Sequence, residues 1–349
     1  MLNSLKIKNF RAFKDLRVDS IERVNLVVGQ NNIGKTSLLE AVHLYSSDEV
    51  VSAAIRLLQR RQEYFLEENS HVVLLGRLFH QDSTEPIEIG EISGENQLVM
   101  RRKWRWNRDG EDDGRLEWQD GDHPPQGVER TELLTIYQRP KPSHTIQMYS
   151  DESLAKRSWL HRSSNSSLFL SYSGFQADSI NTAELWDRIV LTDNEHDVLG
   201  ALEVVEPALE RIVMVQGGRP QRTAMVKLPD RPPIPLHSLG DGMNRLFELS
   251  LGLVNVGKVF LVDEIDSGLH YTTLVDVWRL VFETAAKLQV QVFATTHSWD
   301  CIEAFQQAAA EHPSDGLLIR LEQGEDGIRA ETFSEEELAI VTRESIEVR

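Results

Sequence analysis

Gly29-Gln30-Asn31-Asn32-Ile33-Gly34-Lys35-Thr36 is the stretch that decides the fold, because it fits the phosphate-binding pattern G-x-x-x-x-G-K-[ST] at every fixed position. The apolar, β-branched run 24–28 before it predicts a buried strand, and residues 37–42 after it predict a helix. Backbone N–H groups in such a loop and at the helix N-terminus present partial positive charge to phosphate oxygens. We therefore expect a nucleoside triphosphate site.

The loop also supplies the expected ligands. Lys35 is suited to reach the β- and γ-phosphates, and the Thr36 hydroxyl is suited to ligate Mg²⁺. The nucleotide-binding residues predicted from this stretch are Gly29, Asn31, Asn32, Gly34, Lys35, Thr36 and Ser37. The alternative is a glycine turn before a helix that happens to end in Lys-Thr, and the flanking strand and helix argue against it.

Composition limits the class of protein. With 349 residues, 40% of them hydrophobic, the chain can form one large or two ordinary domains. No apolar stretch approaches the roughly eighteen residues of a membrane span, and the N-terminus lacks the order of a secretory signal. We expect a cytoplasmic protein without a membrane partner. The net charge of −18 argues against a surface that grips nucleic acid everywhere, although a local basic groove stays open.

The two ends of the chain carry the clearest periodicity. Short strands are expected at 5–8 and 16–18, with a turn at Lys14-Asp15 between them. In the last third, strands and helices alternate, which predicts a parallel sheet. The expected elements there are a helix at 241–254, strands at 259–262 and 290–295, a helix at 270–288, strands at 317–321 and 328–333 and a helix at 335–346.

The middle of the chain shows a different pattern. Alternating strands at 71–80, 87–92 and 97–106 predict an antiparallel meander. Helical periods are expected at 49–63, 182–191 and 195–212, and a hairpin turn at 216–220. Residues 139–173 carry little readable pattern.

Two carboxylates follow the apolar strand 259–262. Asp263 is suited to hold the Mg²⁺ that bridges the phosphates, and Glu264 to orient and deprotonate the attacking water. Both lie at the carboxyl end of a buried strand, where open α/β sheets bind ligands. The alternative is a strand that ends in two solvated acids, which a phosphate loop in the same chain makes less attractive.

Two further stretches are candidates. Thr295-Thr296-His297-Ser298 ends another strand, and His297 there can contact the γ-phosphate or the attacking water; alone, such a histidine would more often be structural. The loop from Ser238 to Arg245 carries Gly240 and Gly242 and leads into a helix. It is either an ordinary glycine turn with a helix cap or an anion site used in trans, on a nucleotide held by a second subunit.

Taken together, these motifs resemble ABC-type ATPases. Residues 9–14, 29–41, 238–245, 263–270 and 295–298 occur in the order found in that family. More narrowly, the set resembles the RecF/SMC-like branch that contains the overcoming-lysogenization-defect (OLD) ATPases and their stand-alone relatives. The resemblance covers both ends of the chain well and residues 49–173 poorly.

The resemblance implies an α/β fold, namely an ABC-type P-loop ATPase head with a mixed sheet and an inserted α+β region. It divides the chain into residues 1–48 and 236–349, the two halves of the head, and 49–235, inserted strands and helices that partly complete it. OLD nucleases continue into a Toprim domain that this sequence lacks. Nor does the sequence contain the long heptad segment of a coiled-coil arm. It is expected to be an ATPase head without its own nuclease.

The resemblance also implies roles for single residues. ATP with Mg²⁺ is expected between the Lys35 loop of one subunit and the Ser238–Gly242 loop of the other, in a head-to-head homodimer or a higher oligomer. Asp266 would approach the dimer seam, His297 would sense the γ-phosphate, and Arg11 matches a basic residue near the nucleotide. Gly240 stands where the family has its signature serine, with Ser238 two places earlier, so the residue that touches the γ-phosphate stays open. Gln176 is a candidate for a metal-linked glutamine.

The best nucleic-acid candidate is the stretch from Arg101 to Arg108, in which basic residues and tryptophans are interleaved. Against it, strand alternation splits the charges between two faces, and an acidic loop follows. A solvated strand is therefore the competing interpretation.

Three functional hypotheses follow. The first is an ATP-hydrolysing switch of the OLD type that controls a separately encoded effector protein in bacterial anti-phage defence. The second is a RecF-like DNA-repair ATPase that clamps DNA. The third is a nucleotide-binding scaffold that hardly hydrolyses, which the intact Asp263-Glu264 pair disfavours.

Overall fold

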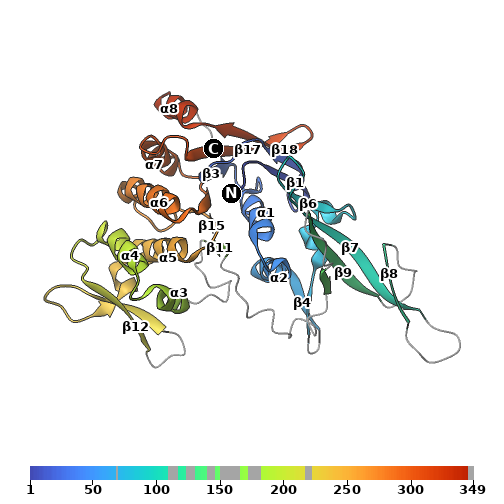
Figure 1. Cartoon of the computed structure of the whole chain (residues 1–349), viewed down its shortest axis with the longest axis horizontal. Coiled ribbons are helices and arrows are strands. Elements are labelled where there is room, and N and C mark those ends of the chain that lie inside the picture. Colours follow the sequence, from blue (N-terminus) through green and yellow to red (C-terminus); the bar gives the residue numbers. More distant parts are fainter. Residues whose placement is uncertain are drawn as a thin grey trace.

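The structure, a computed structural model, describes residues 1–67, 70–108, 117–122, 130–139, 146–149, 166–171, 182–216 and 222–344. Its central element is a mixed sheet (Figure 1). In spatial order its strands are β11 (Ser167–Leu170), β15 (Val259–Val262), β16 (Gln291–Thr295), β3 (Val24–Gly29), β17 (Gly316–Gly324) and β18 (Gly327–Phe333). β11 to β17 run parallel and β18 is antiparallel, so the expected mixed α/β class is confirmed.

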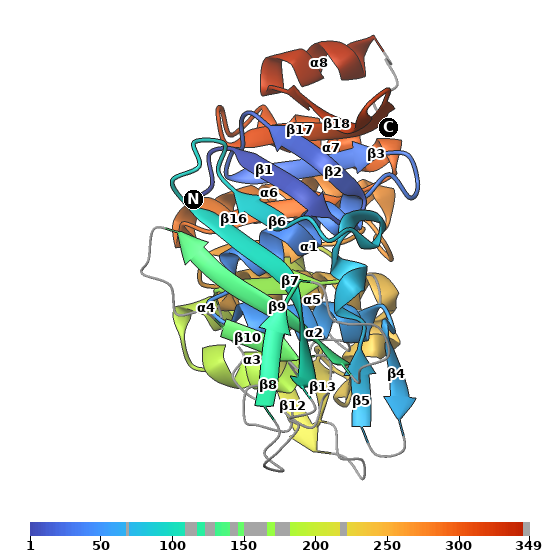
Figure 2. The same cartoon turned by 90° about the vertical axis from the view of Figure 1, so that its right-hand side faces the viewer.

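A second, antiparallel sheet lies beside the first (Figure 2). In spatial order it consists of β10 (Ile146–Tyr149), β9 (Arg130–Arg139), β7 (Gln97–Arg108), β6 (Ile87–Gly90), β1 (Leu5–Phe10) and β2 (Phe13–Val18), with β8 (Glu117–Gly121) paired to β7. Only two strands of the expected antiparallel meander, β6 and β7, pair in this sheet, because the first expected strand pairs elsewhere. The N-terminal strands take its place, since β1 pairs with both β2 and β6.

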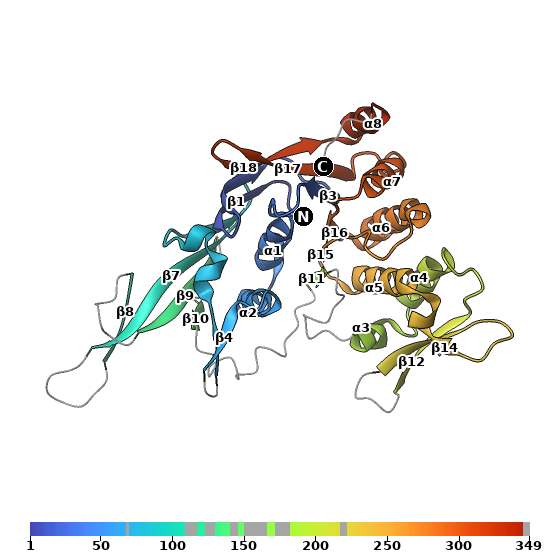
Figure 3. The same cartoon turned by 180° about the vertical axis from the view of Figure 1, so that it is seen from behind.

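Two hydrophobic cores hold the layers together. Leu26 and Val28 of β3 point into one core, which α5 (Asp241–Asn255), α6 (Leu274–Leu288) and α7 (Trp299–Ala309) cover. Val27 points to the other face, where α1 (Lys35–Ser46) and α2 (Val50–Arg60) pack beneath the antiparallel sheet. All six residues of β3 are buried, as expected for a strand covered on both faces (Figure 3).

The remaining elements flank these layers. α3 (Thr182–Ile189) and α4 (Asp193–Glu203) pack on α5 together with the small sheet β12 (Arg211–Gln216), β13 (Arg222–Lys227) and β14 (Ile234–Pro235). The other elements are β4 (Tyr64–Glu67), β5 (Ser70–Val73), α8 (Glu335–Arg343) and the 3₁₀ turns η1 (Leu75–Leu78), η2 (His80–Asp82), η5 (Leu236–Leu239) and η6 (Tyr271–Thr273). Within the described residues, no helix is long and apolar enough to cross a membrane.

Three expectations about local structure are wrong. The first hairpin turns at Arg11-Ala12 rather than at Lys14-Asp15, which lie inside β2. The strand expected at 71–80 ends at Val73, because the chain then folds into η1 and η2. The helix expected at 195–212 ends at Glu203, and its last residues form a turn and the start of β12. Of the hairpin turn expected at 216–220, residues 217–220 lie outside the described residues; β12 and β13 on either side pair antiparallel, with Gln216 opposite Arg222.

A buried histidine stands where α1 meets β11. His43 is 4% exposed, its Nδ1 lies 3.0 Å from the Ser167 hydroxyl, and its ring packs edge-on against Phe169. Burial, reinforced by Arg56 and Arg60, lowers the pKa of His43 to about 3. Because the unfolded chain has an ordinary histidine pKa, it binds this proton at a pH where the folded protein does not.

We therefore predict that stability rises with pH between about 3 and 6.5, the interval over which His43 is protonated only in the unfolded chain. Lowering the pH from 7 to 5 should cost about 2 kcal/mol of unfolding free energy through this residue. Urea unfolding of wild type and His43→Gln across this range tests it: the variant should lose this part of the slope. His196→Gln, in an exposed position of α4, is the control, and equal slopes for wild type and His43→Gln would contradict the prediction.

Candidate functional site

The phosphate loop joins β3 to α1 through two glycine positions that no other residue fits. Gly29 has φ 142°, and an added Cβ would lie 2.5 Å from the Leu321 carbonyl oxygen. Gly34 has φ 104°, and an added Cβ would lie 3.0 Å from Ala12 and Phe13. These backbone conformations belong to glycine, and they bring the loop back over the start of the helix.

Lys35 folds back over this loop. Its ammonium donates to the carbonyl oxygens of Gly29 at 2.7 Å and Gln30 at 3.1 Å. Burial lowers the pKa of Lys35, while the nearby carboxylates of Asp263 and Glu264 oppose that shift. The side-chain nitrogen of Lys35 thus lies at the mouth of the loop, where it is suited to meet a phosphate.

Asp263 is the hub of the site. Its carboxylate accepts hydrogen bonds from the Thr36 hydroxyl at 3.0 Å and from the Thr295 hydroxyl at 2.7 Å. Three elements therefore converge on one side chain: the start of α1 and the ends of β15 and β16. The Arg60 guanidinium lies 3.9 Å from the same carboxylate and stacks over the Phe169 ring.

Glu264 is displayed by an unusual backbone. Its φ of 52° lies in the left-handed region, and its N–H donates to the Thr295 hydroxyl at 2.9 Å. The Ser267 hydroxyl donates to its carboxylate at 3.1 Å, and His297 Nδ1 lies 4.0 Å from it. The structure thus brings the predicted base, Glu264, close to the predicted sensing histidine, His297. A strained backbone such as that of Glu264 is typical of functional sites.

A buried arginine braces this turn. Arg245, on α5, donates to the carbonyl oxygens of Ser171 at 2.7 Å, Asp263 at 3.0 Å and Glu264 at 2.9 Å. Only 5% of the surface of Arg245 is exposed to solvent. Sequence reasoning placed Arg245 at the end of a glycine loop but gave it no role, because only the fold brings α5 against β15.

These groups line a pocket of about 720 Å³. Of the predicted residues, those that line it are Arg11, Asn31, Asn32, Gly34, Lys35, Thr36, Ser37, Asp263 and Glu264. Arg11 reaches the pocket with a neutralised charge, since its side chain is 4% exposed and pairs with Glu40 at 2.7 Å and Glu63 at 2.9 Å.

Sequence reasoning missed the far wall of the pocket. This wall consists of Arg60, Arg61, Glu63, Gly76, Arg77, Phe79, Gln81 and Asp82, from the end of α2 and from η1 and η2. The only sign of this wall in the sequence is the charged run at the end of the apolar-faced helix α2. The sequence does not show which element that run faces.

The second predicted loop lies apart from this pocket. Ser238 and Gly240 are exposed at the N-terminus of α5, and an added Cβ on Gly242 would lie 3.0 Å from the Gly268 carbonyl oxygen. Asp266, two residues before Gly268, accepts a hydrogen bond from the Thr296 hydroxyl at 2.6 Å. The glycine loop and the Asp266 loop are therefore neighbours. Gln176 lies outside the described residues.

The residues present fit a magnesium nucleotide. The Thr36 hydroxyl and the Asp263 carboxylate are adjacent oxygen donors beside a phosphate loop, which is the donor chemistry that Mg²⁺ prefers. In the part of the chain that the structure describes, no group of three or more His, Cys, Asp or Glu residues could hold a metal by itself. Such a site suits an ion that keeps phosphate and water ligands rather than a protein cage.

Comparison with known proteins agrees with this chemistry. Residues 24–300 match the family model described as "AAA domain, putative AbiEii toxin, Type IV TA system". An ATP/GTP phosphatase of Helicobacter pylori is 22% identical over 354 residues, which cover 89% of each chain. The DNA replication and repair protein RecF of Oenococcus oeni is 51% identical over 45 residues, but these are only 13% of this chain and 12% of RecF.

Solved structures of SMC heads also match. The SMC head bound to the C-winged helix domain of ScpA gives a TM-score of 0.49 at 12% identity, covering 95% of this chain and 97% of that chain. The SMC head domain from Thermotoga maritima gives a TM-score of 0.43 at 14% identity, covering 95% and 99%.

We predict that Arg245→Lys destabilises the protein and slows ATP hydrolysis. A lysine cannot reproduce the arginine fork, and a buried carbonyl left without a donor costs about 1–3 kcal/mol. Urea unfolding should show a loss of about 2 kcal/mol or more, and kcat should fall because the turn at Asp263 and Glu264 loosens.

Arg279→Lys is the matched control, because this exposed arginine on α6 pairs with Glu311 at 2.6 Å and touches no part of the site. It should change stability by less than about 0.5 kcal/mol. If Arg245→Lys is as stable and hydrolyses ATP as fast as the control, Arg245 does not brace the turn at Asp263 and Glu264.

Proposed function

The chain belongs to the AAA-domain family that its sequence matches, with a P-loop ATPase head of the RecF/SMC type, and from that premise we propose that it is an ATP-driven switch. ATP binding closes a homodimer and hydrolysis reopens it. In the manner of stand-alone OLD-family ATPases, this cycle controls a separately encoded effector protein in anti-phage defence.

The observation that carries this proposal is that the Ser238–Gly242 loop lies outside the pocket that the phosphate loop lines. The pocket beside Lys35 is lined by α1, the end of α2, η1, η2 and the ends of β15 and β16. The Ser238–Gly242 loop is absent from its described lining, yet Ser238, Gly240 and Asp241 are exposed at the start of α5. A second copy can bring that loop to the pocket, which explains an anion-binding loop with no anion site of its own.

The chain's own residues divide the work. The N–H groups of the phosphate loop and the Lys35 ammonium hold the phosphates, while Thr36 and Asp263 would hold Mg²⁺, which would supply positive charge beside the phosphates. Glu264 accepts the proton of the attacking water, and Ser267 and His297 orient its carboxylate and the γ-phosphate. Such a base typically accelerates the reaction about 10²–10⁴-fold. Because it acts on the attacking water and does not hold the nucleotide, its loss should slow hydrolysis and spare ATP binding.

Two features support an effector protein as the partner. The family description names a type IV toxin–antitoxin system, which fits an ATPase that acts with a separately encoded protein. The net charge of −18 suits association with proteins better than a general grip on nucleic acid.

We predict that Glu264→Gln traps an ATP-bound dimer. The variant keeps Lys35, Thr36 and Asp263 but lacks the base, so light scattering after gel filtration should show twice the monomer mass with ATP and Mg²⁺. Lys35→Ala should stay monomeric under the same conditions, because its loop has lost the phosphate cation. ATP hydrolysis by Lys35→Ala at the wild-type rate would contradict the assignment of the ATPase site to the phosphate loop. A wild-type protein that binds ATP without hydrolysing it would favour the nucleotide-binding scaffold.

A RecF-like DNA clamp is the second candidate. RecF proteins are among the relatives. Arg101 and Lys103 lie on one face of β7, and the guanidinium carbon of Arg101 lies 5.7 Å from the centroid of the Tyr137 ring. Arg102 does not join them, because it pairs with Asp82 at 2.7 Å and with Glu132 on the other face of the strand. The interleaved run thus supplies fewer available cations than its sequence suggests.

This candidate makes a separate prediction. If DNA binds along β7, duplex or single-stranded DNA should raise the ATPase rate, and Arg101→Glu with Lys103→Glu should abolish the increase. The control pair is Lys287→Glu with Arg343→Glu, exposed cations on α6 and α8 away from β7. An unchanged ATPase rate with every form of DNA would eliminate the clamp and leave the effector switch.

A further inference from the structure

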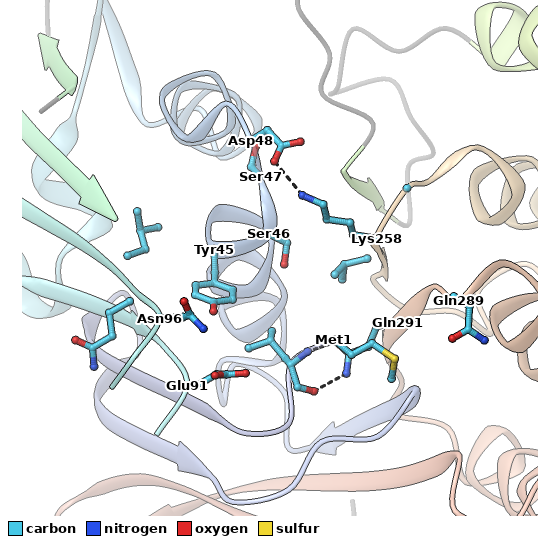
Figure 4. Close-up of a pocket in the computed structure, with 15 residues that line it drawn as sticks. Met1, Tyr45, Ser46, Ser47, Asp48, Glu91, Asn96, Lys258, Gln289 and Gln291 are labelled. Carbon is cyan, nitrogen blue, oxygen red and sulfur yellow. Dashed lines mark hydrogen bonds and ion pairs between the residues drawn. The ribbon is translucent and has the colours of Figure 1, made fainter. Parts of the chain in front are cut away.

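A second pocket lies at the opposite edge of the parallel sheet from the phosphate loop. It has a volume of about 600 Å³, within the usual range of small-ligand sites (Figure 4). Its walls come from the C-terminal end of α1, the first residues of β15 and β16, and the turn from β6 to β7. Along α1, Tyr45 in this pocket lies about 15 Å from Lys35, at 1.5 Å per residue.

One end of the pocket gathers three polar side chains. Tyr45, Glu91 and Asn96 lie together there, and the Glu91 N–H donates to the Asn96 carbonyl oxygen at 3.3 Å. Among the described residues, no hydrogen bond or ion pair engages the Tyr45 hydroxyl or the Glu91 carboxylate. Partial burial and the charge of Glu91 raise the pKa of Tyr45, so the two groups share one environment. They form an acceptor-rich corner.

The other charged side chains of the lining are already paired. Lys258 and Asp48 form an ion pair at 3.0 Å across the mouth (Figure 4). Gln291 is fully buried, and its amide bonds the backbone of Leu2 and the Glu22 carbonyl oxygen. Glu91 is therefore the one charged side chain of the described lining without an opposite charge.

Two further features set the kind of ligand. α1 ends at Ser46, so the negative end of its dipole faces the pocket and adds to the charge of Glu91. Leu2, Leu98 and Val259 supply an apolar wall of the pocket. An aliphatic chain would pack on that wall while its cationic end reaches the carboxylate.

We propose that this pocket binds a guanidinium or ammonium group carried on an aliphatic chain, with Glu91 pairing the cation, Tyr45 and Asn96 accepting its remaining N–H bonds, and the apolar wall holding the chain. The group can belong to a free small molecule or to an arginine or lysine side chain of a partner protein. This site is separate from the proposed nucleotide site, and its occupancy does not depend on ATP.

Isothermal titration of the full chain without nucleotide tests this directly. n-Butylguanidinium and n-butylammonium are the probes, and n-butylurea, which has a similar shape without the charge, is the reference. The cations should bind and the urea should not. Glu91→Gln should weaken binding about tenfold or more, because a charge-assisted hydrogen bond is lost, and Tyr45→Phe should weaken it a few-fold.

Glu95→Gln is the matched control, since this exposed acid lies on the same β6–β7 turn but outside the lining, and it should bind as wild type does. Thermal unfolding of each variant confirms that it folds. No binding of either cation at about 10 mM, or equal binding by wild type and Glu91→Gln, would overturn the proposal.

A peptide arm identifies the source of the group. Acetyl-Gly-Arg-Gly-amide and its citrulline counterpart differ only in the charge at the end of the side chain. Tighter binding of the arginine peptide than of n-butylguanidinium would assign the pocket to a partner's side chain, and weaker binding would assign it to a free small molecule. Because the readout is heat of binding, it is independent of whether the protein hydrolyses ATP.

Discussion

The hydrogen bonds to the Asp263 carboxylate are the constraint on which the rest of the site depends. One comes from Thr36 at the start of α1 and one from Thr295 at the end of β16, while Asp263 itself directly follows β15. They can form only because the parallel register sets Val262 opposite Ala294, and Thr295 opposite Val27. The sheet thereby fixes the relative positions of the phosphate loop and the acidic pair before any ligand arrives.

Arg245 extends this constraint to the surface that a second copy would meet. It ties α5 to the carbonyl oxygens of Asp263 and Glu264, and the N-terminus of the same helix carries the Ser238–Gly242 loop. In the proposed switch, a change at the acidic pair that accompanies hydrolysis would reach that loop through this buried side chain and the helix that carries it. This connection gives the proposed switch a physical route from the chemistry to the dimer seam.

The local parts of the site could be predicted from sequence because their signals are local. The phosphate loop and the strand before Asp263 follow from fixed spacings and apolar runs. The wall that contains Arg60 and Arg77 could not, because it depends on how α2 and η1 pack, and β11 was hidden in a polar stretch of weak pattern. The misplaced first turn has a clear cause: Lys14-Asp15 looks more turn-like than Arg11, which nonetheless adopts a φ of 48°.

The most direct test of the account is whether two inactive copies restore each other. Lys35→Ala spoils the phosphate loop, and Ser238→Glu places a negative charge on the exposed loop that would face the partner's nucleotide. In a mixed dimer one composite site would contain both defects and the other neither. We predict that the two variants, each nearly inactive alone, regain a substantial part of the wild-type ATPase rate when mixed. A mixture with no more activity than the sum of its components would contradict a site completed by a second copy.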